Sequence, residues 1–351
     1  MKSISHQAHQ PIDRNILSGM LSYLAADCER EQWVRVLMAI KSEFGDTAKE
    51  LAREWSATAT NYKPKDFAYT WKSIKPKGAV SIATLVRLAV ENGYKFAPMT
   101  DADKKRLAYE SQQRKEQQIK AQAEEMQRLD NQYKRVSEQA YQILKHATPA
   151  LDNHPYLIRK GIASHGVLFG SVMTYQNALI VPMYGSDGAM AGEVQTLQFI
   201  QPDGTKRFLA GGKKTGGYYP IQWIDGAPIV ICEGFATGAT LAEHYTPFSS
   251  VVCAFDAGNL LPVAKAFKRH YPMTQIIIAG DNDHLDKESN PTAFNTGRFK
   301  AIEAAKAIDA LISIPEFDPL EVGSDWNDRY HLDQQNQVLE DYEQTLLEGD
   351  A

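Results

Sequence analysis

The sequence predicts a mixed α/β protein: an all-helical N-terminal segment, a long helical linker and a mostly parallel β-sheet flanked by helices. Across residues 16–96, apolar and aromatic residues recur at spacings of three and four, as on the buried face of a helix. Between Thr100 and Thr148 there is neither glycine nor proline, which favours one long helix. Beyond Pro228, short β-branched runs alternate with helical patterns, which indicates parallel strands covered on both faces.

Composition and periodicity divide the 351 residues into segments. Residues 177–210 contain three β-rich runs separated by the turn signals GSDG and QPDG, so we expect an antiparallel meander ahead of the parallel sheet. The apolar seam of the linker is too short for a coiled-coil dimer, so we expect this helix to pack within the chain. The expected segments are a helical domain over 12–97, a charged helical linker over 98–148, a small α+β subdomain over 149–227, an α/β domain over 228–333 and a C-terminal helix or tail over 334–351.

Composition also argues against several classes of protein. The net charge is −5, with 38 basic and 43 acidic residues, so nucleic-acid binding has to come from local patches. The three cysteines, Cys28, Cys232 and Cys253, form no CxxC or Cys/His cluster, which argues against zinc and against disulfides and fits a reducing cytoplasm. No apolar run is long enough to span a bilayer, and residues 1–10 lack the apolar stretch of a signal peptide. We therefore expect a cytoplasmic protein without a membrane partner.

Carboxylates follow the ends of three predicted parallel strands. Glu233 directly follows PIVIC, Asp281 and Asp283 follow QIIIAG, and Asp325 and Asp328 lie in the loop after LISI. In an open α/β sheet the carboxyl ends of the strands meet at one edge, where ligands bind. Carboxylates gathered there repel one another, and a divalent cation removes that cost. Oxygen ligands without histidine or cysteine favour Mg²⁺ or Mn²⁺ over zinc.

The Asp-x-Asp motif has two interpretations. In an extended segment, positions i and i+2 project to the same side, so Asp281 and Asp283 can reach one ion or a pair of ions. An Asp-x-Asp after a strand also suits a turn followed by a helix cap. We favour the metal site because three separate strand ends carry acids.

Basic residues in three places are candidates for phosphate binding. The stretch KRFLAGGKKTGG sets lysines between glycine pairs that let a backbone approach a phosphate, although a solvated hairpin connection would look the same. The RKG turn offers two cations that suit either a nucleic-acid backbone or plain surface charge. In NYKPKDFAYTWKSIKPK, lysines alternate with aromatics as on single-strand-binding surfaces, but Phe67 and Trp71 also suit a core. The candidates are Lys63, Lys65, Lys72, Lys75, Lys77, Arg159, Lys160, Lys206, Arg207, Lys213 and Lys214.

These motifs together resemble a known family. The CEG, GDND and GSDWND segments resemble the Toprim domain, a Rossmann-like domain shared by bacterial-type primases, topoisomerases and some nucleases. The segment HPYLIRKGI, the meander and KRFLAGGKKTGG resemble the subdomain that precedes Toprim in bacterial replicative primases. The N-terminal WVRVLMAIKSEFG and TWKSIK resemble the helical "primase C-terminal, second" domain of phage and plasmid primase and helicase proteins.

The resemblance implies roles for individual residues. It makes Glu233 the acid next to the reacting groups and a catalytic residue together with Asp281 and Asp283. It assigns metal ligation to Glu233, Asp281, Asp283, Asp325 and Asp328, the last two at a spacing one residue wider than in replicative primases. Arg207 resembles the basic residue of the primase cradle, with Lys214 as a second.

The sequence also departs from the family pattern. Thr237 stands where Toprim primases usually carry an aspartate. The zinc-binding module that recognises the template in replicative primases is missing, as the cysteine count shows. If this chain is a primase, another part of it has to hold the template.

From these features we expect a DNA primase, a DNA-directed RNA polymerase that uses two Mg²⁺ ions to join ribonucleoside triphosphates into short primers on single-stranded DNA. Its expected setting is the replication of a phage, a plasmid or another mobile genetic element. No GxxxxGKS or GxxxxGKT phosphate loop is visible, so we expect a separate replicative helicase as partner. The alternatives are a Toprim nuclease, whose metal site activates water, and a non-catalytic single-strand-binding replication adaptor. Too little chain remains for the strand-passing gate of a topoisomerase.

Overall fold

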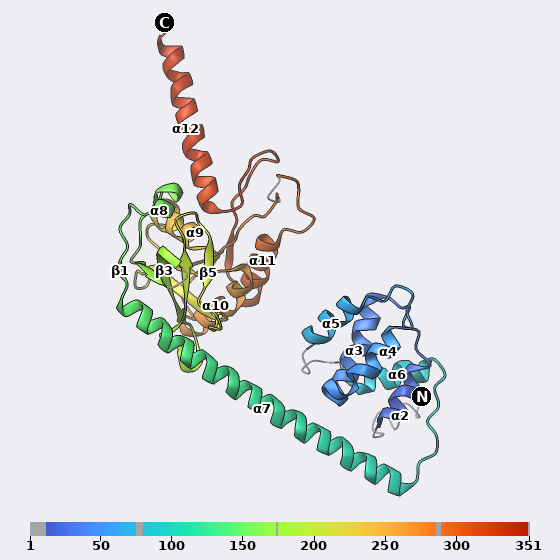
Figure 1. Cartoon of the computed structure of the whole chain (residues 1–351). Coiled ribbons are helices and arrows are strands. Elements are labelled where there is room, and N and C mark those ends of the chain that lie inside the picture. Colours follow the sequence, from blue (N-terminus) through green and yellow to red (C-terminus); the bar gives the residue numbers. More distant parts are fainter. Residues whose placement is uncertain (1–11, 75–79, 173–174, 286–288, 350–351) are drawn as a thin grey trace. The chain divides into compact units, whose positions relative to one another are not determined.

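Figure 1 shows the chain, a computed structural model that describes residues 12–74, 80–172, 175–285 and 289–349. The chain divides into two units, Met1–Arg128 and Leu129–Ala351. The mixed α/β class expected from the sequence is confirmed, since helices form the first unit and the second contains a sheet whose strands β8, β7, β9 and β10 are parallel.

Helices of the first unit enclose a core of their own. Helix α3 shows why they form: its sequence REQWVRVLMAIKSEF buries Val36, Leu37, Ile40 and Phe44 along one face. Phe67 and Trp71 are each only 2% exposed, so these aromatics belong to the core and not to a surface. The elements are α2 (Arg14–Leu21), α3 (Arg30–Phe44), the 3₁₀ turn η1 (Gly45–Ala48), α4 (Lys49–Ser56), α5 (Pro64–Ser73) and α6 (Ile82–Glu91).

The expected linker is one continuous helix, α7 (Asp101–Lys145). Salt bridges between residues three or four positions apart lie along its surface, for example Arg106 with Glu110 and Lys134 with Asp130. Its last turns pack within the second unit, where Ala140 is fully buried and the Ser137 hydroxyl donates to the Val194 carbonyl at 2.6 Å. Packing within the chain is therefore confirmed for this end of the helix.

The second unit is built on one sheet. Among the described residues, ten strands join in the order β1-β2-β3-β6-β8-β7-β9-β10, with β4 and β5 continuing from β3. The meander expected over residues 177–210 is present as the antiparallel strands β3, β4 and β5. The strands are β1 (Thr148–Pro149), β2 (Leu168–Val172), β3 (Tyr175–Gly185), β4 (Val194–Ile200), β5 (Lys206–Phe208), β6 (Gly217–Gln222), β7 (Ile229–Cys232), β8 (Ser250–Cys253), β9 (Ile276–Ala279) and β10 (Leu311–Ser313).

Helices cover both faces of the parallel strands β8, β7 and β9, whereas Leu311 and Ile312 of the edge strand β10 are exposed. Side chains that alternate along β7 enter different cores: Val230 packs with α9, whereas Ile229 and Ile231 pack with α10 and α11. Burial on both faces explains why these strands read as unbroken apolar runs. The remaining elements are α8 (Pro155–Lys160), the 3₁₀ turn η2 (Gly188–Met190), α9 (Phe235–Thr240), the π-helical turn η3 (Leu241–Tyr245), α10 (Ala257–His270), α11 (Thr296–Ile308) and α12 (Trp326–Gly349).

The register of the parallel strands places their carboxyl ends in one row. Cys232 at the end of β7 pairs with Cys253 of β8 and with Ala279 of β9. Ala279 in turn pairs with Ser313 of β10. Residues that follow these four positions therefore emerge at the same edge of the sheet.

The final helix begins earlier than expected. The sequence suggested a helix after Asp333, but α12 starts at Trp326. Its first turn is anchored by Asn327, which is fully buried and donates to the Lys160 carbonyl at 2.7 Å and to the Thr240 hydroxyl at 2.8 Å. This anchor joins α12 to α8 and α9.

Gly280 is the residue at which strand β9 meets helix α11 most closely. A methyl group added there would lie 2.3 Å from the Ala301 Cβ, too close for either backbone to remain in place. We expect Gly280→Ala to lower the free energy of unfolding by about 1–3 kcal/mol through overpacking. Urea denaturation would measure the change. Gly19→Ala, which meets only the edge of the Tyr94 ring at 3.3 Å, is the control. Equal stability of Gly280→Ala and wild type would contradict this packing.

Candidate active site at the carboxyl ends of the parallel strands

The predicted acids of β7 and β9 emerge at the shared edge of the sheet. Glu233 follows β7 directly, and Asp281 and Asp283 follow β9 after Gly280. Between the two aspartates, Asn282 is only 9% exposed and donates to the Pro315 carbonyl at 2.8 Å. Of the two flanking aspartates, Asp283 accepts the Gly297 N–H at 2.8 Å in the first turn of α11, and its charge also raises the pKa of Glu233.

Burial and mutual repulsion perturb these carboxyl groups. Burial, and after it the Asp283 charge, raises the pKa of Glu233 to about 7, although the Ala257 N–H partly offsets the rise. Burial, followed by the charges of Glu233 and Asp325, raises the pKa of Asp281 well above its usual range. The acids therefore lie close enough to oppose one another's ionisation.

Two carboxylate oxygens stand out because they are buried without a hydrogen-bond partner among the described residues: Glu233 Oε2 and Asp281 Oδ1. A buried acceptor left unpaired is costly, and a hard divalent cation would satisfy it. As the described side chains stand, no three His, Cys, Asp or Glu groups converge tightly enough to hold one ion. The fit to a cation therefore rests on the two unpaired oxygens and on the repulsion among neighbouring acids.

The later acidic pair has partners within the protein. Asp325 accepts the Asp328 N–H at 2.8 Å and the Thr237 hydroxyl at 3.3 Å. Asp328 accepts the Ser324 N–H at 3.0 Å and lies 3.5 Å from the Lys160 ammonium. Both aspartates thus help to begin α12, while Asp325 still contributes to the raised pKa of Asp281.

The cations of strand β5 are divided between its two faces. The Lys206 ammonium lies 6.0 Å from the centre of the Tyr156 ring, and its charge lowers the pKa of both Glu233 and Asp281. Arg207, the next residue, projects from the opposite face because strand side chains alternate; it is exposed and pairs across the ladder with Phe199. The sequence could not separate these two neighbours.

The glycine-rich lysine loop is fixed beside the acidic edge. Asn259 of α10 accepts the Gly216 N–H at 2.7 Å and donates to the carbonyls of Gly217 and Ala254, both at 2.8 Å. The Lys214 ammonium lies 4.8 Å from the centre of the Phe208 ring, and that ring contacts Phe255 just after β8. Buried Asn259 therefore ties the loop to the end of β8, which argues against a freely moving hairpin connection.

The remaining candidate cations are more scattered. Arg159 donates to the Pro202 carbonyl at 3.0 Å and lies over the Tyr156 ring, while Lys213 is partly exposed. Lys63, Lys65 and Lys72 are exposed on the first unit. Lys75 and Lys77 lie outside the described residues.

Sequence reasoning missed one acid at this edge. Asp256 stands three residues after β8, at the start of α10, and its charge adds to the raised pKa of Glu233. The signal was present, because SVVCAFD ends an apolar strand on an acid just as PIVICE does. The same rule that selected Glu233 would have selected Asp256.

The perturbed Glu233 predicts a pH-dependent stability in metal-free buffer. A carboxyl group whose pKa is raised by folding binds its proton more tightly in the folded state, so the free energy of unfolding falls as the pH rises from about 4.5 to about 7. We expect Glu233→Gln to be more stable than wild type at pH 8, by about 2–3 kcal/mol, and equal to it near pH 4.5. Chemical denaturation across this range measures the difference. Exposed Glu316→Gln is the control, and an offset between wild type and Glu233→Gln that stays constant with pH would exclude ionisation of Glu233 as its cause.

Comparisons with known proteins identify two parts of the chain. Residues 17–89 match the family described as Primase C terminal 2 (PriCT-2), and residues 228–333 match the Toprim domain. A DNA primase TraC of Escherichia coli is 36% identical over 208 residues, which cover 57% of this chain and 18% of the relative. A second DNA primase TraC of Escherichia coli is 40% identical over 174 residues, covering 48% and 11%. The chain thus spans less than a fifth of the length of these relatives.

Two solved structures are also similar at low identity. The primase fragment of the bacteriophage T7 primase-helicase protein has a TM-score of 0.38 and 16% identity, covering 54% of this chain and 73% of that one. The primase domains of gp4 in a complex with bacteriophage T7 lagging-strand DNA polymerase give the same TM-score and identity, with coverages of 55% and 90%.

The family matches carry the assignment, and they confirm the family expected from the sequence motifs. Toprim proteins of the primase type generally use divalent cations, in agreement with the unpaired carboxylate oxygens. Residues 228–333 therefore form a Toprim domain, and residues 17–89 belong to the family described as Primase C terminal 2.

Proposed function

We propose that this chain is a DNA primase that lays short RNA primers on single-stranded DNA during the replication of a phage, a plasmid or another mobile element. The observation that carries the proposal is the pair of buried, unpaired oxygens on Glu233 and Asp281 at the ends of adjacent strands, with the Lys206 charge beside them. The similarity to DNA primase TraC supports a polymerase over the other Toprim activities.

The acidic edge would hold the metal. Glu233, Asp281 and Asp283 are the proposed principal ligands, and Asp325 and Asp328 would complete the set. An all-oxygen set suits Mg²⁺ or Mn²⁺ and not zinc. When bound, such ions neutralise charge on the reacting α-phosphate and favour ionisation of the attacking 3′-hydroxyl.

The other residues of the site would bind and orient the substrates. Lys206, next to the acids, and Lys214, on the loop anchored by Asn259, are placed to pair with the triphosphate. Lys160, which contacts Asp328 at 3.5 Å, and Lys213 would add positive charge around it. Glu233, whose Oε2 is buried and unpaired, would help to hold the ion that favours ionisation of the attacking 3′-hydroxyl.

Template and partners follow from the same proposal. The exposed Lys63, Lys65 and Lys72, with Lys75 and Lys77, would contact the phosphates of the single-stranded template, and Arg159 and Arg207 would contact backbone near the site. A separate replicative helicase would supply unwinding. Among the described residues, no helix combines the length and the apolar character needed to cross a bilayer. We propose a cytoplasmic setting, where template and nucleotides are present.

A priming assay tests the proposal. The protein is incubated with labelled ribonucleoside triphosphates, Mg²⁺ and circular single-stranded DNA, beside Asp281→Asn and the exposed control Asp318→Asn. We expect oligoribonucleotides from wild type and control, and a loss of about 100-fold or more in Asp281→Asn, because a group that stabilises the transition state is removed. Nicked circles in place of oligoribonucleotides would establish the nuclease alternative. If neither product appears, the single-strand-binding adaptor is the alternative that remains.

The opposite faces of β5 on which Lys206 and Arg207 lie give a second test. We expect Lys206→Ala to raise the KM for nucleotide and to lower kcat by about 10-fold or more, because it removes a charge that lowers the pKa of the acids. Arg207→Ala, on the opposite face, should keep a KM for nucleotide close to that of wild type. Steady-state primer synthesis at varied nucleotide concentration measures both. A raised KM for nucleotide in Arg207→Ala, with Lys206→Ala close to wild type, would show that Arg207 and not Lys206 binds the nucleotide.

A further inference from the structure

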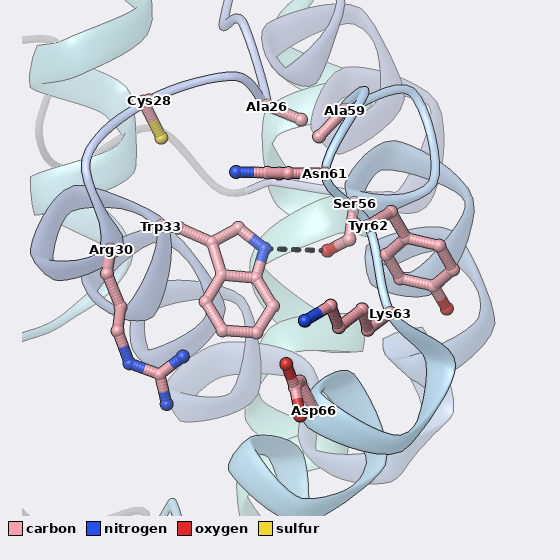
Figure 2. Close-up of a pocket in the computed structure, with 10 residues that line it drawn as sticks. All are labelled: Ala26, Cys28, Arg30, Trp33, Ser56, Ala59, Asn61, Tyr62, Lys63 and Asp66. Carbon is pink, nitrogen blue, oxygen red and sulfur yellow. Dashed lines mark hydrogen bonds between the residues drawn. The ribbon is translucent and has the colours of Figure 1, made fainter.

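A cavity in the helical N-terminal unit is separate from the acidic edge of the sheet. It has a volume of about 320 Å³ and is bounded by the first turns of α3 and α5, the end of α4 and the loop between α4 and α5 (Figure 2). A cavity of this size matches the lower range of small-ligand sites. The residues that give it chemical character are Arg30, Trp33, Ser56, Asn61, Lys63 and Asp66.

Trp33 provides a fixed aromatic wall. Its indole N–H donates to the Ser56 hydroxyl at 3.0 Å, and Ser56 is held in turn by the Ala52 carbonyl at 2.8 Å. The other two tryptophans of this unit, Trp55 and Trp71, are only 7% and 2% exposed, whereas Trp33 is only partly buried. The cavity therefore presents a flat ring in one orientation to whatever enters it.

Polar groups of complementary kinds surround this ring. Arg30 and Lys63 are exposed at the rim, and neither forms an ion pair with any described residue. Figure 2 shows both side chains extending beside the indole, with Asn61 and Asp66 at the same cavity. Two cations against one carboxylate make the rim positive, while the amide of Asn61 offers both a donor and an acceptor.

We propose that this cavity binds one nucleotide unit of single-stranded DNA, with the base stacked on Trp33 and the phosphate between Arg30 and Lys63. Stacking on an aromatic ring next to cations is how single strands are held without a sequence requirement. Asn61 and Asp66 can hydrogen-bond the edge of the base. Lys65 and Lys72 lie exposed on the adjoining helix α5 and would meet the neighbouring phosphates, which favours a strand over a free nucleotide.

The inference rests on the proposed function only in calling the bound single-stranded DNA a template. Binding of DNA is therefore measured in the absence of primer synthesis. The full chain is titrated against a fluorescein-labelled oligothymidylate in EDTA at fixed salt, and anisotropy gives the affinity. We expect Trp33→Ala to weaken binding about fivefold or more and Trp33→Phe to retain most of it. Arg30→Glu should also weaken binding. The controls are Tyr109→Ala, an aromatic 65% exposed on helix α7, and Arg35→Glu on helix α3, and both should stay within about twofold of wild type.

Two outcomes would overturn the inference. If Trp33→Ala and Arg30→Glu both bind the oligonucleotide as wild type does, the cavity is not a DNA site. If Trp33→Ala changes only the binding of unlabelled ATP, tested in a parallel titration, the cavity takes a free nucleotide and the template assignment is wrong. Because Trp33 packs against the core, thermal unfolding of each variant is compared with wild type, and exposed Arg30→Glu decides the matter if Trp33→Ala unfolds.

The priming assay separates this inference from the proposed function. If oligonucleotide binding depends on Trp33 but the protein makes no primers, the inference stands and the proposed function is refuted. If the protein makes primers but Trp33→Ala and Arg30→Glu leave its affinity for the oligonucleotide unchanged, only the inference is refuted and the proposed function stands.

Discussion

Repulsion among carboxylates that have lost their water is the constraint on which the rest of this site depends. Strands β7 and β9 are buried between two layers of helices. Their parallel pairing aligns Cys232 with Ala279, so the residues that follow these two positions emerge at one edge. Neighbouring acids raise the pKa of Glu233 and of Asp281, and one oxygen of each stays unpaired among the described residues. Such an arrangement opposes folding, and it becomes favourable when a cation enters.

The same sheet explains how the basic groups reach the acids. Strands of the meander and of the Toprim domain share one sheet and one core, in which Ile200 of the former and Val230 of the latter are both buried. Pairing of β5 with β4 places Lys206 and Arg207 on opposite faces, and Asn259 of α10 ties the lysine loop to the end of β8. Under the proposed function, the α+β subdomain and the Toprim domain would form one surface, with the cations contributed by the former and the acids by the latter.

Much of this arrangement could be predicted because it depends on strongly patterned segments. Unbroken apolar runs indicated the parallel sheet, and the acids after PIVIC and QIIIAG followed from the common edge. The sequence could not predict which face of β5 carries Lys206 and which carries Arg207. A strand of three residues shows no periodicity, and its register is set by its partners on β4. The early start of α12 depends on the distant contacts of Asn327, and the Trp33 cavity on three separate helices, neither of which is a local pattern.

Every proposed role at the acidic edge requires that Glu233 and Asp281 hold a divalent cation together. A crystal grown with Mn²⁺ and measured at a wavelength where manganese scatters anomalously tests this requirement. We expect an anomalous peak in coordination contact with oxygens of both carboxylates. A well-diffracting crystal with manganese elsewhere, or with Glu233 and Asp281 free of metal at saturating Mn²⁺, would contradict it.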